Sequence, residues 1–314
     1  MTHSKITLNV HHDADGIGAA VLLAKGLGLE HSEVTVHFPE GFGENHGEDY
    51  MVDMKPADPD FEGIVYDHHP GHPKKKNRKY KLIWDNVPAG VVVYNKHKDT
   101  IPIEDRWKVV VSAMGDVSPE SIPLSVFKEN PELLFEQVWV TNNNWGEDKP
   151  PLQLRKLEQL SSRINAVSRM GELKLAFDIL FKATSVDSLL NNKICLQHVK
   201  KQNTVVNSIY KKWKDNELPK PVIIKGMFLF AIIDTPMPFQ GYCSTSLSNK
   251  LGMTTVVLNS STGNISIRGK FTNIVKEGIA KSGVTAGGHS VASGGSLPDG
   301  MDYAAFQNIL EGIL

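Results

Sequence analysis

The feature that constrains this chain most is a run of three titratable residues placed almost directly after an apolar segment. The run 63–65 has the character of a buried strand, and Asp67, His68 and His69 follow it with only Tyr66 between. Open α/β sheets place their chemistry in such loops, at the carboxyl ends of their strands. A lone triplet of this kind also occurs in ordinary surface turns, so its meaning depends on the rest of the chain.

Three more apolar runs also lead into acidic residues. The run 6–10 leads into His11, Asp13 and Asp15, the run 50–52 into Asp53, and the run 109–115 into Asp116. If all four runs are neighbouring strands of one parallel sheet, the side chains at their ends converge at one edge. Carboxylates and imidazoles suit hard divalent metals, and two ions about 3.5–4 Å apart need several carboxylates, one of them shared. The pattern therefore predicts a two-metal site.

Around these runs the chain alternates strand-like and helix-like segments. Small residues and a helical apolar stripe at 16–25 predict a helix after the first strand. The alternating pattern at 33–38 predicts another strand, and 88–94 begins a further helix. This order predicts an α/β domain with a doubly wound, mostly parallel sheet. Gly16 and Gly18 either let a ligand or backbone approach closely or only permit tight packing of helix on sheet.

The rest of the chain predicts a helical part and then a second domain. Apolar residues recur at helical spacing over 152–213, and the segment 217–221 breaks this pattern. Beyond the break we expect a smaller α/β domain, with strands at 222–224, 227–233, 254–258 and 264–268 and a helix at 273–281. The expected division is an N-terminal domain over 1–185, a helical connector over 186–219 and a C-terminal domain over 220–314.

A candidate anion site lies in this C-terminal part. Arg268 ends a predicted strand, and a glycine-rich segment follows at 286–295. Gly287 and Gly288 would leave backbone N–H groups open to an anion, with His289 able to donate a hydrogen bond beside them. The segment alone could be a flexible turn. Together with Arg268, whose guanidinium can hold a phosphate by two parallel hydrogen bonds, it predicts a phosphate clamp.

Composition restricts the class of protein. The chain has 314 residues, of which 40% are hydrophobic and 22% charged, as in soluble globular proteins. No apolar run reaches the roughly 18 residues that indicate a membrane span, and the polar start lacks the apolar stretch of a secretory signal. We therefore expect a cytoplasmic protein without a membrane partner. Cys195 and Cys243 have no ligand spacing, which favours packing roles for both.

The charge pattern leaves nucleic-acid binding open. A net charge of −1 argues against a protein that coats long nucleic acid by charge alone. The segment 74–81 is nonetheless densely basic, with five lysines and an arginine. A run like this is most often a solvated loop, and the alternative is a surface that binds a phosphate backbone beside the metal site.

Together these motifs resemble those of the DHH phosphoesterase superfamily, in the branch with the DHH-associated C-terminal domain that includes RecJ-like exonucleases and nanoRNases. The resemblance covers nearly the whole chain. It rests on His11, Asp13 and Asp15, on Asp53, on the Asp67-His68-His69 triplet, on Asp116, on the segment from Arg163 to Arg169, and on Arg268 with the glycine-rich segment. RecJ proteins generally carry an acid where His11 stands, so the subtype differs at this position.

The resemblance implies a cofactor of two manganese ions, which magnesium or cobalt could replace. It assigns His11, Asp13 and Asp53 to one ion and Asp15, Asp53, His68 and Asp116 to the other, so that Asp53 bridges the two. His69 would face the scissile phosphate, and Asp67 would orient the neighbouring histidines. The residues implied in substrate binding are Arg163, Asn165, Arg169, Arg268, Gly287, Gly288 and His289.

The implied reaction is phosphodiester hydrolysis in the N-terminal domain, with the C-terminal domain holding the substrate across a cleft. The first expectation is a RecJ-like, manganese-dependent exonuclease acting on single-stranded DNA or short oligonucleotides, with replication or repair proteins as candidate partners. This chain has no room for the additional oligonucleotide-binding domain of bacterial RecJ, so processive digestion of long strands is not expected.

Two other functions stay open at this point. One is a small-substrate phosphodiesterase acting on dinucleotides, cyclic dinucleotides or a nucleotide bisphosphate, which the modest net charge favours. The other is a catalytically silent scaffold in a replication or repair assembly. The complete set of acids argues against the scaffold, because a silent protein gains nothing from keeping so many repelling carboxylates together.

Overall fold

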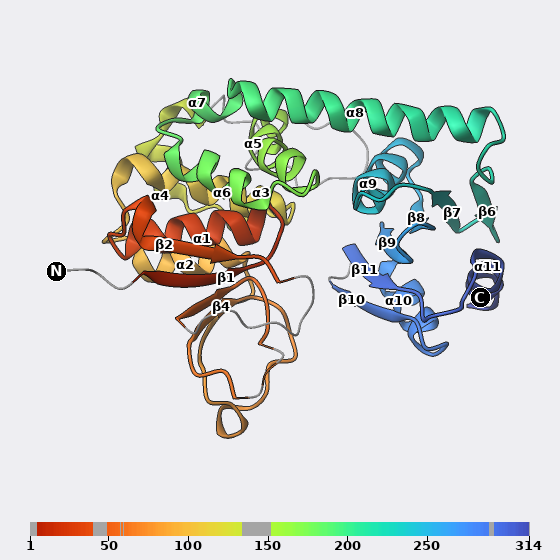
Figure 1. Cartoon of the computed structure of the whole chain (residues 1–314), viewed down its shortest axis with the longest axis horizontal. Helices are drawn as coiled ribbons and strands as arrows, with labels where there is room; N and C mark the ends of the chain where they lie inside the picture. The colour runs from red at the N-terminus through yellow and green to blue at the C-terminus, as the bar shows by residue number, and fades with distance from the viewer. Residues whose placement is uncertain are drawn as a thin grey trace. The chain divides into compact units, whose positions relative to one another are not determined.

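The computed structural model describes residues 5–39, 49–56, 58, 60–133, 152–288 and 292–313. The chain forms two compact units, Met1–Lys200 and Lys201–Leu314 (Figure 1). Each unit has its own sheet and its own hydrophobic core. Among the described residues, no helix has both the length and the apolar character needed to cross a membrane.

The first unit is built on a five-stranded parallel sheet with the order β2-β1-β3-β4-β5. Its strands are β1 (Ile6–Val10), β2 (Val34–His37), β3 (Tyr50–Val52), β4 (Ile64–Asp67) and β5 (Lys81–Trp84). The chain adds β2 on one side of β1 and the later strands on the other side. The order therefore reverses between β1 and β3, as it does in doubly wound sheets, where ligands bind at this reversal. The expected α/β architecture is confirmed.

The described part of the first unit and its continuation contain eight helices, one between β1 and β2 and the others after β5. They are α1 (Ala14–Gly26), α2 (Ala89–His97), α3 (Val109–Gly115), α4 (Leu124–Glu129), α5 (Leu152–Ser168), α6 (Leu173–Lys182), α7 (Val186–Leu190) and α8 (Lys193–Lys214). Short 3-10 helices lie in the connections, among them η2 (Lys75–Asn77) between β4 and β5 and η3 (Ile103–Lys108) between α2 and α3. The division between the two units falls within α8.

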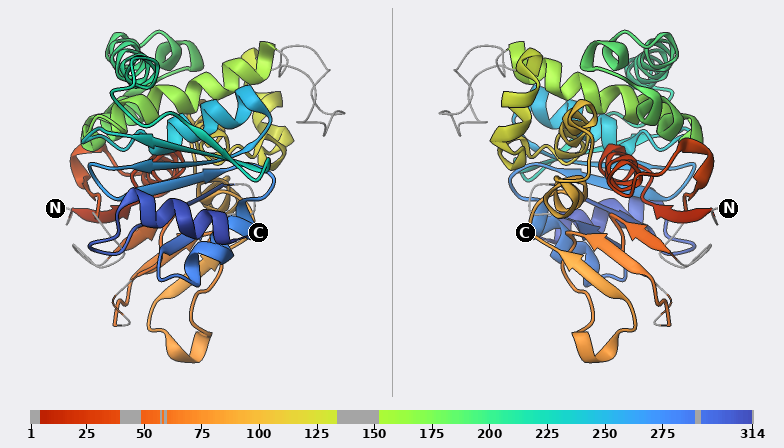
Figure 2. Two further views of the ribbon diagram at one scale, coloured as in Figure 1. Left: turned by 90° about the vertical axis from the view of Figure 1, so that its right-hand side faces the viewer. Right: turned by 90° about the vertical axis from the view of Figure 1, so that its left-hand side faces the viewer.

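The two faces of the first sheet are covered differently. Leu8, Val52 and Tyr66 face the main core, which also holds the buried residues of α1, α2 and α3. Met51 and Val65, one position away on their strands, face a smaller cluster that loop residues complete. Figure 2 shows the loop between β4 and β5, drawn in orange, extending beyond the sheet. Alternation along the strands thus divides the apolar residues between a helical layer and a loop layer.

The segment 109–115 is the helix α3, so the expectation of a strand before Asp116 was wrong. Its residues Val109 to Met114 are all buried, and α3 packs against α1, α2 and α5. A short apolar run that is buried on every side has no periodicity to distinguish a strand from a helix. Asp116 therefore reaches the sheet edge from the end of a helix that follows η3.

Glycines allow these helices to pack closely. A Cβ on Gly18 of α1 would lie 2.9 Å from the Cβ of Ser112 on α3, and a Cβ on Gly90 of α2 would lie 2.2 Å from the Ser112 hydroxyl. Both distances are shorter than a real contact permits. Gly18 thus serves close packing of α1 on another helix, α3, and not on the sheet as the packing alternative in the sequence analysis had it.

The second unit contains a six-stranded mixed sheet with the order β10-β11-β9-β8-β7-β6. Its elements are β6 (Val222–Ile224), β7 (Phe228–Ile233), α9 (Gln240–Leu251), β8 (Thr254–Asn259), β9 (Asn264–Arg268), α10 (Thr272–Ala280), β10 (Thr285–Gly288), β11 (Ala292–Ser296) and α11 (Tyr303–Gly312). Among these described strands, β7 and β8 pair in parallel and the other pairs are antiparallel. Apolar residues of α10 and α11 share a core with the central strands. The end of α8 is anchored by Trp213, whose indole N–H donates to the Ile232 carbonyl at 2.7 Å.

The packing at Gly90 can be tested by one substitution. We expect Gly90→Ala to lower the free energy of unfolding by about 1–3 kcal/mol, the usual cost of overpacking a core. Gly312→Ala is the matched control because a Cβ there meets no atom within 4 Å, and it should be neutral or slightly stabilising. Urea unfolding of both variants makes the comparison, and equal stabilities would contradict the packing described here.

Candidate metal centre

The candidate site lies where the strand order of the first sheet reverses. His11 and Asp13 follow β1, Asp53 follows β3, and His68 follows β4. The strand ends are adjacent in the sheet, since Val10 pairs with Val52 and Val52 pairs with Tyr66. Parallel strands deliver these residues to one edge, as the sequence predicted.

The turn after β1 is fixed by two hydrogen bonds. Asp13 caps α1 by accepting from the Gly16 N–H at 3.0 Å. The Ala14 N–H donates to the Asn165 side-chain oxygen at 2.9 Å. A Cβ on Gly16 would lie 2.5 Å from the His11 carbonyl oxygen, so glycine lets the backbone close this turn. Gly16 therefore serves close backbone approach.

Asp15 lies in the first turn of α1 and is fully buried. Its carboxylate accepts from the Ala89 N–H at 2.8 Å and from the Gly90 N–H at 3.0 Å, both at the start of α2. The Ser112 hydroxyl also donates to it. A helix N-terminus favours a negative charge, so α2 stabilises the carboxylate that the fold buries here.

Asp53 adopts a backbone conformation that most residues avoid. Its φ is +59°, in the left-handed region that aspartate and asparagine enter more readily than other non-glycine residues. Its N–H donates to the Tyr66 carbonyl at 2.8 Å, which extends the β3–β4 pairing by one residue. The residue is 2% exposed. Strained backbone of this kind concentrates at functional sites.

Imidazole nitrogens and carboxylate oxygens converge in two groups around Asp53. His11 Nδ1 lies 3.0 Å from Asp13 Oδ2 and 3.2 Å from Asp53 Oδ2. On the other side, His68 Nε2 lies 3.2 Å from Asp53 Oδ1, 3.1 Å from Asp116 Oδ2 and 3.6 Å from Asp15 Oδ2. The two oxygens of Asp53 thus face different groups. The structure brings together all six residues that the sequence named as candidate ligands.

Burying several carboxylates close together is electrostatically unfavourable, and the pKa values of the site show this. Burial raises the pKa of Asp53 well above its usual value, and the charges of Asp15 and Asp13 raise it further. Burial, Asp15 and Asp53 raise the pKa of Asp116 in the same way, and burial raises the pKa of Asp15. Burial would lower the pKa of His11, but Asp13 and Asp53 raise it well above its usual value. The cluster therefore favours a cation.

A divalent metal fits these donors. Three groups of residues place their ligand atoms within 4.8 Å of one another: His11 with Asp13 and Asp53, Asp15 with His68 and Asp116, and Asp53 with Asp67, His68 and His69. His11 Nδ1 and Asp53 Oδ1 are buried but make no hydrogen bond to any described residue. Buried polar atoms are normally hydrogen-bonded. His11 Nδ1 and Asp53 Oδ1 lie among the other donor atoms without hydrogen bonds to them, as ligand atoms around a metal ion do.

Behind this cluster, Asp67 is held by histidines on both sides. Its Oδ1 accepts from His69 Nδ1 at 2.8 Å, and its Oδ2 accepts from His72 Nε2 at 2.7 Å. His72 Nδ1 is in turn 2.8 Å from the Tyr80 hydroxyl. Burial would raise the pKa of Asp67, but the hydrogen bonds from His69 and His72 lower it below its usual range. Asp67 thus orients His69.

The sequence did not identify His72, Tyr80 or Ser112 as parts of the site. His72 offered a signal, because it is a third histidine in the same loop, four residues after His68. Tyr80 and Ser112 offered none, because they reach the site only through the folded arrangement of a loop and of α3. Ser112 donates to Asp15 of the cluster, whereas His72 hydrogen-bonds Asp67 behind it and Tyr80 hydrogen-bonds His72.

The predicted substrate residues on and after α5 have partners in the structure. Arg163 Nε donates to the Leu190 carbonyl at 3.2 Å, which connects α5 with α7. Asn165 holds the start of α1 through Ala14. Arg169 lies just after α5, and its charge contributes, after burial and His11, to the lowered pKa of His12, which is about 4. Their roles in substrate binding stay a prediction.

In the second unit, Arg268 ends β9 as expected, and its Nη1 donates to the carbonyls of Ile267 and Ser293 at 2.9 and 3.0 Å. Gly287 and Gly288 do not lie in an open loop. They belong to β10, which pairs with β11 so that Gly287 lies opposite Gly294. His289 falls outside the described residues. The glycine-rich segment is thus mainly a hairpin, and its anion-binding role stays a prediction.

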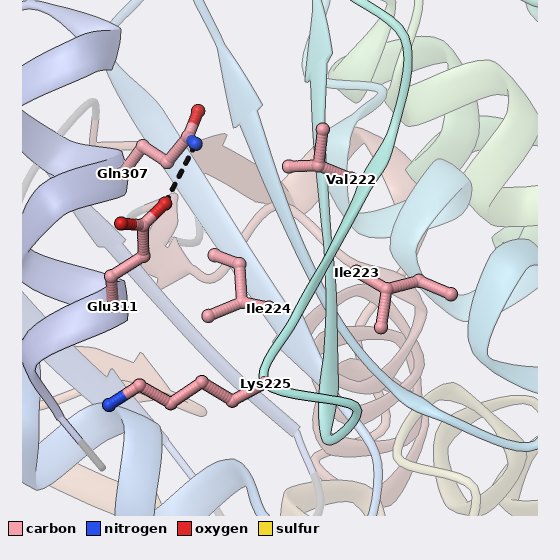
Figure 3. Close-up of a pocket in the computed structure, with 6 residues that line it drawn as sticks. All are labelled: Val222, Ile223, Ile224, Lys225, Gln307 and Glu311. Atoms are coloured by element: carbon pink, nitrogen blue, oxygen red, sulfur yellow. Dashed lines mark hydrogen bonds between the residues drawn. The ribbon is translucent and has the colours of Figure 1, made fainter.

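A hollow of about 270 Å³ lies at the β6 edge of this second sheet, lined by Val222, Ile223, Ile224, Lys225, Gln307 and Glu311 (Figure 3). The amide of Gln307 donates to Glu311 at 2.9 Å along α11, on one side of the hollow. None of the predicted site residues lines this hollow. The candidate chemistry therefore lies at the edge of the first sheet.

No protein-family model matches the sequence, and no curated protein matches it. Solved structures do match. RecJ from Thermus thermophilus in complex with Mn²⁺ gives a TM-score of 0.67 at 16% identity, over 99% of this chain and 52% of that chain. An exonuclease RecJ bound to manganese gives 0.55 at 16% identity, over 99% and 89%. The DHH domain of a member of the s1p family of ribosomal proteins gives 0.65 at 14% identity, over 99% and 87%.

These likenesses extend over both units. The chain therefore shares the fold of these RecJ and DHH-domain structures, a two-unit α/β architecture, and the candidate centre lies in its first unit. It spans about half the length of the Thermus thermophilus RecJ chain. Sequence identities of 14% to 16% show a similarity of fold alone.

The crowded carboxylates predict how metal and pH act together. Because the pKa values of Asp15, Asp53 and Asp116 are raised, the metal-free protein should lose stability as pH rises from about 4 through those raised values. A metal ion binds the ionised carboxylates and displaces their protons. We expect saturating Mn²⁺ to raise Tm more at pH 8 than at pH 6, as measured by calorimetry after chelator treatment. An equal shift at both pH values would contradict this electrostatic account.

Proposed function

We propose that this protein is a metal-dependent phosphodiester hydrolase, and most specifically a manganese-dependent, RecJ-like exonuclease on single-stranded DNA or short oligonucleotides. The observation that carries the proposal is the placement of the two oxygens of Asp53 between two groups of donors. In a RecJ-like fold, such an arrangement supports two ions that share one carboxylate.

The proposed ligands of one ion are His11, Asp13 and Asp53, and those of the other are Asp15, Asp53, His68 and Asp116. The convergent donor groups in the structure support these sets. Two bound ions would supply an activated water for attack on phosphorus and positive charge for the phosphoryl oxygens. Manganese is the first choice, with magnesium or cobalt as substitutes, because RecJ proteins of the same fold are bound to manganese.

The remaining residues of the site are proposed to contact the substrate or to position the residue that does so. His69 is 29% exposed at its side chain, and Asp67 accepts from its Nδ1, so Nε2 is the nitrogen proposed to contact a substrate phosphate. His72 and Tyr80 fix Asp67 from behind. A histidine held in one orientation loses less freedom when it binds a phosphate, which is the benefit of preorganisation.

The proposed domain roles follow the sequence expectation, with catalysis by 1–185, a helical connector over 186–219 and substrate binding by 220–314. Arg163, Asn165, Arg169, Arg268, Gly287, Gly288 and His289 are the proposed substrate residues. The carbonyl partners of Arg268 Nη1 support its role, since they hold the guanidinium in one orientation. A cytoplasmic location and replication or repair partners belong to this proposal.

The bridging role of Asp53 is tested by Asp53→Asn. Asparagine tolerates the left-handed backbone and keeps the shape of aspartate while removing the charge. We expect the metal-free variant to be at least as stable as the wild type, because one of the crowded carboxylates is gone. Loss of both ions should remove several kcal/mol of transition-state stabilisation, which lowers hydrolysis about 1000-fold or more.

The matched control for this variant is Asp299→Asn, which alters an exposed aspartate of the second unit. Manganese stoichiometry by calorimetry and rates on an end-labelled oligodeoxynucleotide should be unchanged in the control. A bridging role for Asp53 would be refuted by two bound manganese ions, or by wild-type rates, in Asp53→Asn.

The basic segment gives a second test of the substrate. Lys74, Lys75 and Lys76 are exposed around η2, whereas Lys79 pairs with Asp60 at 2.9 Å. If the three lysines contact phosphates, changing them to glutamine should flatten the salt dependence of binding by about 0.7 per lost contact. Hydrolysis of a dinucleotide should hardly change.

The control changes three other lysines of the first unit to glutamine, namely Lys96, Lys98 and Lys128, which lie away from the segment 74–81 in the sequence. Binding is measured by fluorescence anisotropy of a labelled single strand at several salt concentrations. If the salt dependence of binding has the wild-type slope in both triple variants, the segment 74–81 is a solvated loop that does not contribute to binding of the strand.

A further inference from the structure

Trp84 ends β5, at the edge of the first sheet and beside the candidate centre. It pairs with Asp67 of β4 in the sheet register. Its indole N–H donates to the His69 carbonyl at 3.0 Å. His69 Nδ1 itself lies 3.8 Å from Asp53 Oδ1. A single residue, His69, therefore connects the indole of Trp84 with the side chains that converge on the candidate centre.

Trp84 is 48% exposed, although tryptophan has the largest side chain and that side chain is mostly apolar. The other hydrophobic residues of β5, Leu82 and Ile83, pack against the two cores of the unit. Core packing therefore does not account for the position of Trp84. Leaving so much apolar surface in water is unfavourable.

The hydrogen bond to His69 restricts the orientation of the exposed ring. A tryptophan side chain has one polar atom, the indole N–H, and here that atom is already satisfied by a backbone carbonyl. What remains for a ligand is an apolar aromatic face. Such a face suits a second flat ring and offers nothing specific to a bare phosphate chain.

We propose that Trp84 is a stacking platform for a nucleobase of the substrate, next to the scissile phosphate. The substrate class is then a strand or oligonucleotide with an unpaired base, and not a base-free phosphate polymer. Because every base has a π face, the platform tolerates any sequence. This inference rests on the proposed phosphodiester hydrolysis and adds to it the group that the protein recognises beside the reacting bond.

The test compares two substrates and two variants. The substrates are an oligothymidylate and an oligonucleotide of the same length with abasic sites in place of the bases. Trp84→Ala removes the ring, and Trp84→Phe keeps an aromatic face while removing the hydrogen bond. Tyr303→Ala is the matched control, because Tyr303 is 49% exposed on α11 of the second unit.

We expect Trp84→Ala to weaken binding and raise KM for the oligothymidylate by about 5- to 150-fold, the range that 1–3 kcal/mol of base stacking corresponds to. Trp84→Phe should recover most of this loss. Neither variant should change binding of the abasic strand, and Tyr303→Ala should match the wild type on both strands. Equal losses on both strands, with no recovery by phenylalanine, would mean that Trp84 only positions His69 and would overturn the proposal.

Binding and hydrolysis are measured separately so that the two proposals fail in different ways. If the wild type hydrolyses neither strand with Mn²⁺, the proposed hydrolase fails. The binding comparison still decides the stacking role in that case. A wild type that binds the base-bearing strand no better than the abasic strand contradicts stacking, whereas a preference that Trp84→Ala abolishes supports it.

Discussion

Mutual repulsion among Asp13, Asp15, Asp53 and Asp116 is the constraint on which the rest of the first unit depends. The fold brings their carboxylates together and buries two of them, Asp15 and Asp53, almost completely. Burial and neighbouring charge raise the pKa values of three of the four. The folded protein tolerates this repulsion only if the carboxylates are stabilised, by hydrogen bonds from the surrounding structure and, in our proposal, by bound metal ions.

The compensation comes from elements that lie behind the cluster. Backbone N–H groups of α2 and the Ser112 hydroxyl hold Asp15, and the close approach of α1, α2 and α3 depends on glycines at their contacts. On the opposite side, Asp67 is held between His69 and His72. The helical layer thus fixes one carboxylate and the loop layer fixes another, so that both faces of the sheet contribute to the same edge.

The sequence predicted the parts of the site that follow strands. His11, Asp13, Asp53 and His68 could be found because apolar runs mark the strands and parallel strands deliver their ends to one edge. Asp116 was found for the wrong structural reason, since α3 is too short and too uniformly buried to show a helical period. The predicted strands of the second unit were also found, because β-branched and aromatic runs alternate there with turns.

Other parts of the site could not be predicted from the sequence. The contacts of Ser112 with Asp15 and of Tyr80 with His72 depend on how helices and loops pack, and no local pattern records them. The glycine-rich segment resembles a loop because glycine is poor in strands, yet β11 pairs it into a hairpin. The exposure of Trp84 is likewise a property of its place at the sheet edge.

The central claim is that one carboxylate, that of Asp53, is shared by two metal ions at the edge of the first sheet. A crystal structure of the manganese-soaked protein, with anomalous data collected at the manganese edge, tests it most directly. The account predicts two anomalous peaks about 3.5–4 Å apart, one on the side of His11 and the other on the side of His68, with Asp53 between them. A single peak, or peaks that do not contact Asp53, would contradict it.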